Sequence, residues 1–202
     1  MKIKICGMRD PKNVKEAIGA DVDMVGFIFY PGSKRYVRNI PPIETTSVKR
    51  VGVFVNERED RIREIAHNWS LDLIQLHGDE KPEDCLKLKS LGLPLVKAFQ
   101  VDEHFDFGQL EPYAKVVQFF LFDTKGQNYG GTGKTFDWNI LHNYKLEVPF
   151  WLSGGISPDM AIEIKKLNFP NLIAVDLNSR FEIEPGLKNI EKLKSFVDEL
   201  HS

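Results

Sequence analysis

The sequence predicts a single compact (β/α)8 barrel, an α/β fold that spans residues 1–202 as one domain. Eight short apolar segments, each typical of a buried strand, are followed by a helical pattern or by enough chain to form a helix. This alternation indicates parallel strands joined by crossovers. No linker, low-complexity segment or strong internal repeat divides the chain. A closed barrel accounts for the strand number, although about 250 residues is typical for that fold.

An open doubly wound sheet is the alternative architecture, but the chain lacks the dinucleotide-binding glycine fingerprint after its first strand. The net charge of -2 gives no electrostatic basis for binding nucleic acid or a membrane surface. No apolar run is long enough to span a bilayer, and the N-terminus lacks the apolar core of a signal peptide. Cys6 and Cys85 form neither a disulfide framework nor a metal-ligand spacing. We therefore expect a cytoplasmic protein without a metal.

Short apolar runs bounded by polar residues predict the first four strands, at residues 2–6, 24–29, 51–55 and 71–76. Asp10 followed by Pro11 predicts a helix that Asp10 caps. Asn56 with Glu59 resembles a capping box and predicts that the second helix starts there. Pro82 opens a third helix, whose buried face includes Cys85.

The same pattern predicts four more strands, at residues 95–99, 117–122, 150–152 and 172–175. A weaker helical signal covers residues 105–114. Ser157 followed by Pro158 repeats the arrangement of a cap and a first-turn proline. Apolar residues at helical spacing predict the final helix over residues 190–200.

Polar residues and glycines follow these strands at the end where barrels bind their substrates, namely Cys6, Arg35, His77, Asp123, Ser153, Gly154, Gly155 and Asp176. Asp123 is followed by Gly130, Gly131 and Gly133, a loop that can press backbone amides against a ligand. The simpler reading is a strand that ends in a solvated aspartate before a long turn.

The loops after the seventh and eighth strands are where barrels often hold phosphate through backbone amides and a helix N-terminus. The first contains Gly154 and Gly155, and the second runs from Asp176 to Ser179. We predict a phosphate site there, although Gly154 and Gly155 alone could simply form a tight turn.

Cys6 and Asp123 suit a proton-transfer reaction. The dipole of the helix that starts at Asp10 can lower the pKa of Cys6 and leave a thiolate to act as base. A shielded Asp123 can keep its proton and act as acid. The plainer interpretation of Cys6 is a small buried residue.

His77 either orients a polar group or satisfies a backbone carbonyl, and Arg35 can bind a carboxylate through two parallel hydrogen bonds from its guanidinium.

Several segments occur in an order that resembles one known family. They are 4–8 (KICGM), 26–29 (GFIF), 33–37 (SKRYV), 51–55 (VGVFV), 75–80 (QLHGDE), 130–138 (GGTGKTFDW), 152–155 (LSGG) and 174–176 (AVD). Together with Asp123 they resemble the phosphoribosylanthranilate isomerase family of tryptophan biosynthesis, along nearly the whole chain.

The resemblance implies an Amadori rearrangement of N-(5-phosphoribosyl)anthranilate to 1-(2-carboxyphenylamino)-1-deoxyribulose 5-phosphate, with no metal or organic cofactor. By the same resemblance Cys6 is the general base, Asp123 is the general acid, and Arg35 faces the anthranilate carboxylate. Backbone amides near the phosphate would come from Gly154, Gly155, Asn178 and Ser179. We also expect His77 and Asp176 to contact the substrate.

One loop departs from the family pattern Asp-x-Ser-Ser-Gly-x-Glu, because Asn178 replaces a serine and Arg180 replaces the glycine. If that position needs a positive φ angle, Arg180 is strained or the loop is rebuilt.

Two other functions stay open. One is a histidine-pathway type of aminoaldose–ketose isomerase, although the fifth strand offers Lys97 where an acid would stand. The other is a non-catalytic barrel that binds a phosphorylated metabolite. Either a monomer or a homodimer is expected.

Overall fold

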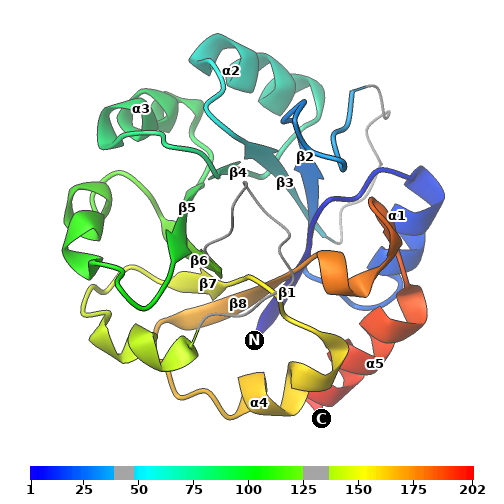
Figure 1. Cartoon of the computed structure of the whole chain (residues 1–202). Helices are drawn as coiled ribbons and strands as arrows, with labels where there is room; N and C mark the ends of the chain where they lie inside the picture. Colours follow the sequence, from blue (N-terminus) through cyan, green and yellow to red (C-terminus); the bar gives the residue numbers. More distant parts are fainter. Residues whose placement is uncertain (39–47, 125–136) are drawn as a thin grey trace.

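In the computed structural model, eight parallel strands close into one barrel surrounded by helices (Figure 1). The structure describes residues 1–38, 48–124 and 137–202. The strands are β1 (Lys2–Ile5), β2 (Met24–Ile28), β3 (Lys49–Phe54), β4 (Leu73–Leu76), β5 (Leu95–Val101), β6 (Phe119–Thr124), β7 (Phe150–Leu152) and β8 (Leu172–Leu177). Each strand pairs with the next, and β8 pairs with β1. The predicted barrel is therefore confirmed, and the open sheet is wrong.

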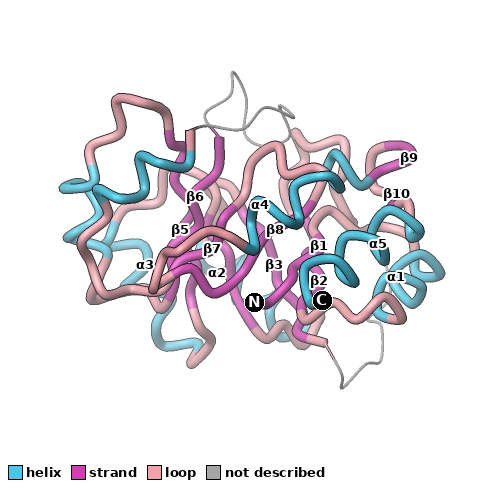
Figure 2. The backbone as a smooth tube through the Cα atoms, turned by 90° about the horizontal axis from the view of Figure 1, so that it is seen from below, coloured by secondary structure: helices cyan, strands magenta, loops and turns pink. Residues whose placement is uncertain are grey.

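The α-helices in the described ranges are α1 (Pro11–Ile18), α2 (Glu59–Asn68), α3 (Pro82–Leu88), α4 (Ala161–Lys165) and α5 (Ile190–His201). Between them lie the 3-10 helices η1 (Lys89–Leu91), η2 (Phe107–Tyr113), η3 (Trp138–Asn143), η4 (Pro158–Met160) and η5 (Ser179–Phe181). A short hairpin of β9 (Glu182–Glu184) and β10 (Leu187–Lys188) lies outside the barrel near α1 and α5 (Figure 2). In the described ranges no helix has the length and apolar character needed to cross a membrane.

The strands alternate their side chains between two hydrophobic layers, because successive residues of a strand point to opposite faces. A small cluster fills the barrel interior, and its buried members are Met24, Val51, Leu73, Val96, Ala98, Leu121, Trp151 and Ala174. The larger cluster lies between the barrel and the helices and includes Ile3 and Ile5 of β1. Lys4 and Cys6 have the opposite parity and point inward. The side chains that point into the barrel are thus apolar in this cluster and become polar toward the carboxyl ends of the strands.

Two helix starts differ in how well the sequence predicted them. Asp10 caps α1 as expected, since its carboxylate accepts a 2.7 Å hydrogen bond from the Asn13 amide. The predicted capping box at Asn56 is wrong, because α2 begins at Glu59 and its N-cap residue is Arg58. Asn56 instead has a φ angle of 50°. Its side-chain carbonyl accepts a 2.6 Å hydrogen bond from the Asp79 amide and so ties two neighbouring loops together.

The predicted helix at 105–114 is a 3-10 helix, η2, which contains Pro112. Proline lacks the amide hydrogen that an α-helix needs in its interior. Strand ends also differ from the prediction. Asp123 and Asp176 lie within β6 and β8, near the carboxyl ends of these strands, rather than after them. The predicted glycine loop at Gly130, Gly131 and Gly133 lies outside the described residues.

The barrel closes where the two ends of the chain meet. In the pairing of β1 with β8, Lys4 stands opposite Asp176 and Ile5 stands opposite Leu177. The N- and C-termini lie side by side at the other end of the barrel (Figures 1 and 2), where the His201 ring lies 3.2 Å from the Met1 carbonyl oxygen. The register of this closing pair therefore brings residues from the start and the end of the sequence together inside the barrel.

Candidate active site

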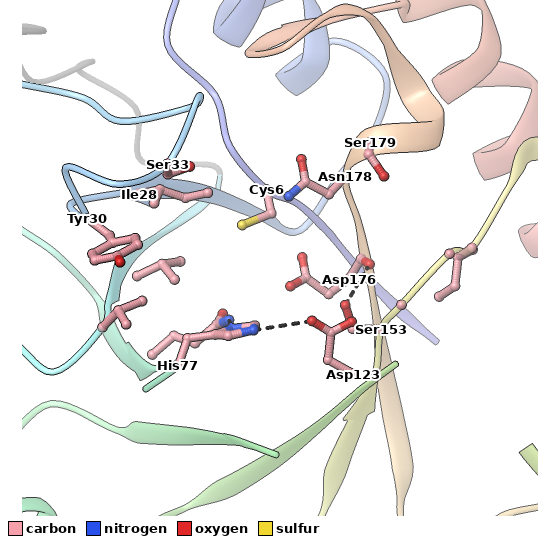
Figure 3. A pocket seen from close by; sticks show the side chains of 16 residues that line it. Cys6, Ile28, Tyr30, Ser33, His77, Asp123, Ser153, Asp176, Asn178 and Ser179 are labelled. Carbon is pink, nitrogen blue, oxygen red and sulfur yellow. Dashed lines mark hydrogen bonds and ion pairs between the residues drawn. The ribbon is translucent and has the colours of Figure 1, made fainter. Parts of the chain in front are cut away.

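A cavity opens among the carboxyl ends of the strands (Figure 3). The lining residues are Cys6, Ile28, Tyr30, Ser33, Val53, Val55, Gln75, His77, Asp123, Ser153, Gly154, Gly155, Ile156, Asp176, Asn178 and Ser179. Every predicted site residue except Arg35 is therefore at this cavity.

Cys6 reaches the cavity from the end of β1. Its amide donates a 2.8 Å hydrogen bond to the Leu177 carbonyl, which extends the pairing of β1 with β8 by one residue. Only 4% of Cys6 is exposed. The next residue, Gly7, has a φ angle of 76° and turns the chain away toward α1. The thiol is thus fixed at the cavity wall by regular strand pairing.

Burial raises the pKa of the Cys6 thiol, because a thiolate is poorly solvated inside the barrel; Lys4 acts in the opposite direction and Asp176 adds to the rise. The expectation that the dipole of α1 lowers this pKa is therefore wrong. The charge that favours the thiolate comes from Lys4, which precedes Cys6 by two residues and shares its inward face.

Asp123 reaches the cavity from β6 and is 6% exposed. One carboxylate oxygen accepts a 2.9 Å hydrogen bond from the Thr124 amide. The other lies 3.2 Å from Nε2 of His77. Figure 3 shows the Asp123 carboxylate and the Cys6 sulfur pointing into the same space from different strands, with Asp176 between them. An acid–base pair and a substrate can meet in this arrangement.

Gln75 and Asp123 contact the two ring nitrogens of His77. The Gln75 amide nitrogen lies 2.9 Å from Nδ1 of His77, and with the amide in this orientation Nδ1 accepts and a ring proton on Nε2 points at Asp123. The Gln75 carbonyl oxygen is buried and has no hydrogen-bond partner in the described structure. If the amide turns over, that oxygen can accept from Nδ1–H, and Nε2 can then accept the proton of a neutral Asp123. The same side chains can thus serve both protonation states of Asp123.

The loop after β7 approaches Asp123 closely. Gly154 has a φ angle of 87° and Gly155 one of 68°, a conformation that suits glycine. A Cβ atom on Gly154 would lie 2.2 Å from the Thr124 hydroxyl oxygen and 2.8 Å from an Asp123 carboxylate oxygen. Gly154 is therefore needed both for the turn and for the space beside Asp123.

The loop after β8 accommodates Arg180 without a left-handed backbone. Arg180 is the central residue of the 3-10 helix η5, and it is not among the described non-glycine residues with positive φ. The strain considered for Arg180 is thus absent. Asn178 and Ser179 line the cavity beside the Gly154–Gly155 turn. Their assignment as phosphate-binding residues stays a prediction.

Arg35 lies beside the cavity, and Glu182 holds its guanidinium. Nε and Nη2 of Arg35 donate to the two carboxylate oxygens of Glu182 at 2.8 and 2.6 Å. The buried Lys188 ammonium donates to the same carboxylate at 2.7 Å and to the side chain of Asn178 at 2.8 Å. Burial lowers the pKa of Lys188 to about 8, and Glu182 acts against this effect. These contacts connect the β9–β10 hairpin to the cavity wall.

The sequence did not single out Lys4, Gln75, Glu182 or Lys188. A signal existed for Lys4 and Gln75, since each precedes a predicted site residue by two positions and so shares its face of the strand. Glu182 is the last residue of the family pattern quoted above for the loop after the eighth strand, but the pattern gives no partner for it. No local pattern identifies Lys188, because its position depends on how the hairpin after β8 folds back.

Comparisons with known proteins agree on one family. A family model described as N-(5'-phosphoribosyl)anthranilate isomerase matches residues 3–199. A protein of that name from Parabacteroides distasonis is 48% identical, covering 99% of this chain and 93% of its own length. The crystal structure of phosphoribosyl anthranilate isomerase from Thermotoga maritima superposes with a TM-score of 0.85 at 33% identity, covering 100% of this chain and 98% of that one. Another such isomerase, solved with reduced 1-(o-carboxyphenylamino)-1-deoxyribulose 5-phosphate, gives 0.77 at 30% identity, with coverage of 100% and 98%.

Proposed function

The chain belongs to the N-(5'-phosphoribosyl)anthranilate isomerase family, and from this premise we propose that Cys6 is its general base and Asp123 its general acid. The protein is an aldose–ketose isomerase of tryptophan biosynthesis that converts N-(5'-phosphoribosyl)anthranilate into 1-(2-carboxyphenylamino)-1-deoxyribulose 5-phosphate. One observation carries the two roles. A buried thiol near an ammonium group and a buried carboxyl group near His77 line the same cavity.

In the proposed mechanism, Asp123 donates its proton to the ring oxygen of the ribose. The nitrogen lone pair of the substrate then forms a double bond to C1 as the C1–O bond breaks, which gives an open-chain iminium ion. The Cys6 thiolate removes the proton from C2, and the electrons of that C–H bond neutralise the iminium to form an enolamine. The enolamine gains a proton at C1 and loses one from its hydroxyl group to become the ketone. His77 hydrogen-bonds the Asp123 carboxylate that the first step creates.

We place the phosphate of the substrate against the loops after β7 and β8. The positive φ angles of Gly154 and Gly155 support this placement, since such turns can aim successive amides at an anion. Asn178 and Ser179 line the same cavity. Glu182 occupies Nε and Nη2 of Arg35, so we assign the remaining edge of the guanidinium, at Nη1, to the anthranilate carboxylate. Asp176, between the acid and the base, is assigned to the sugar hydroxyls.

We propose that the protein is cytoplasmic and that it is a monomer or a homodimer. Sedimentation equilibrium distinguishes the two assembly states.

Cys6→Ser is expected to lower kcat/KM by at least about 100-fold, since removing a general base costs roughly 10²–10⁴ in rate and a serine hydroxyl does not ionise near neutral pH. Wild-type kcat/KM should rise with pH through neutrality, because burial raises the pKa of the Cys6 thiol and only the thiolate accepts the proton. The measurement follows the fluorescence of phosphoribosylanthranilate generated in situ, with the ketose product confirmed by mass.

Cys85→Ala is the matched control, because Cys85 is fully buried in α3, away from the cavity. It should keep the wild-type rate and pH profile. If Cys6→Ser retained wild-type activity, the isomerase would stand and the base assignment would be wrong. If folded wild-type protein gave no turnover, a barrel that only binds the phosphorylated metabolite would replace the enzyme.

A further inference from the structure

Lys4 is a fully buried lysine in the barrel interior that the mechanism above does not use. Its exposed fraction is 0%. The ammonium donates to both carboxylate oxygens of Asp176 at 2.9 Å, and Asp176 is itself 4% exposed. Burying an ion pair carries a large desolvation penalty for each ion, so such a pair is often no more stabilising than apolar residues of similar volume. This pair lies beside the Cys6 thiol, which suggests a role other than stability.

The Lys4 ammonium faces Cys6 as well as Asp176. Lys4 and Cys6 are two residues apart on β1 and therefore point the same way. Gly26 of β2 provides the space for both of them. A Cβ atom built on Gly26 would lie 3.0 Å from the Lys4 nitrogen and 3.0 Å from the Cys6 sulfur. The two atoms are therefore separated by at most twice that distance, which is short enough for one charge to shift the ionisation of the other.

The other charged groups around the thiol do not replace Lys4. The groups that face Cys6 from the neighbouring elements are Asp176 on β8, Lys188 on β10 and Arg35 after β2, with His77 and Asp123 across the cavity. Lys188 and Arg35 share the single carboxylate of Glu182, so one positive charge remains on these three groups. Lys188 also lowers the pKa of Cys6, but less than Lys4 does. Lys4 has one carboxylate partner, and an ammonium group has three donors. The charge of Lys4 is thus shared between Asp176 and Cys6.

We propose that Lys4 is the counter-ion of the Cys6 thiolate and is thereby a positioning residue for the general base. Asp176 competes with the thiolate for the same ammonium group and sets how strongly Lys4 favours ionisation of Cys6. This inference rests on the proposed role of Cys6 as base, but the ionisation of the thiol can be measured without turnover.

Removing the carboxylate of Asp176 and then also the ammonium group of Lys4 should shift the ionisation of the Cys6 thiol in opposite directions. In Asp176→Asn, the thiolate becomes the only anion beside Lys4, and Cys6 should ionise at lower pH than in the wild type. In the double variant Lys4→Met/Asp176→Asn, the cation is gone and no uncompensated carboxylate remains, so Cys6 should ionise at higher pH. The double variant replaces a buried ion pair with uncharged groups of similar volume, and thermal unfolding checks that it folds.

The experiment is the rate of iodoacetamide alkylation of Cys6 between about pH 6 and pH 10, which brackets an ordinary thiol. Peptide mass separates Cys6 from Cys85, whose pKa burial raises to about 11. Near neutral pH the double variant should react about tenfold or more slowly than Asp176→Asn, since an opposite charge at this range shifts a pKa by at least about one. Asp176→Asn should react faster than the wild type.

A double variant that reacts as fast as Asp176→Asn would overturn the proposal. So would an Asp176→Asn variant that reacts no faster than the wild type. The pH profile of kcat/KM then tests the role of Cys6 separately. If alkylation shifts as expected while the kinetic profile does not, Lys4 is the counter-ion of the thiolate and the base assignment is the part that fails.

Discussion

Asp123→Asn is expected to lower kcat by about 10²–10⁴, the usual contribution of a general acid. The amide matches the carboxyl group in size and can still interact with the Thr124 amide and with His77. It cannot deliver a proton to the ribose ring oxygen, so ring opening becomes the slow step. KM should change little, because the shape of the cavity is kept. Single-turnover rates are the appropriate measurement, since product release can hide the chemical step in the wild type.

Asp198→Asn is the matched control for this substitution. Asp198 lies exposed on α5, outside the barrel, and the change from carboxylate to amide is the same. Its kinetic constants should equal those of the wild type. An Asp123→Asn enzyme within about tenfold of the wild-type single-turnover rate would remove Asp123 from the role of acid, since the expected range begins near 10².

Gly154→Ala is expected to reduce both stability and turnover strongly. A positive φ angle costs a residue with a side chain about 1–2 kcal/mol. At Gly154 the new Cβ would also lie 2.2 Å from the Thr124 hydroxyl oxygen and 2.3 Å from the Thr124 amide nitrogen, so β6 or the loop has to move. Either movement displaces Asp123. A 1 Å error in the position of a catalytic group can cost about 100-fold in rate.

Gly92→Ala separates the backbone cost of this substitution from the steric one. Gly92 has a φ angle of 70°, similar to Gly154, but no atom of the described residues lies within 4 Å of the position of its Cβ. Gly92→Ala should therefore lose only about 1–2 kcal/mol in the free energy of unfolding and keep wild-type kinetics. Chemical denaturation and kcat/KM measured on both variants give the comparison. Equal losses in the two variants would show that Gly154 matters only for its turn and not for Asp123.

The parts of the site that the sequence could predict follow from strand periodicity. Short apolar runs predict buried parallel strands, and the carboxyl ends of parallel strands gather at one face of a barrel. Cys6, His77, Asp123 and Asp176 stand at such ends, so the sequence alone brings them together. The structure confirms this gathering at one cavity. Their chemical roles depend on the substrate and stay predictions.

The features that the sequence could not predict depend on contacts between distant segments. The pairing of Lys4 with Asp176 requires the register of β1 against β8, which no local pattern encodes. Asn56 matches a capping box in the sequence, but its hydrogen bond with Asp79 in the next loop prevails. The pKa of Cys6 was predicted from a helix dipole, whereas burial is the larger effect. In each case tertiary structure overrides a local signal.

The closing of β1 against β8 has a consequence for how the enzyme comes into being during translation. Lys4 and Asp176 are separated by 172 residues, so the two halves of the buried ion pair leave the ribosome far apart in time. Until β8 emerges, the first strand has one open edge and an ammonium group without its carboxylate partner. A chain that terminates before β8 therefore lacks the counter-charge of Lys4 as well as a barrel wall. We expect the proposed proton transfer to require the completed pairing of β1 with β8.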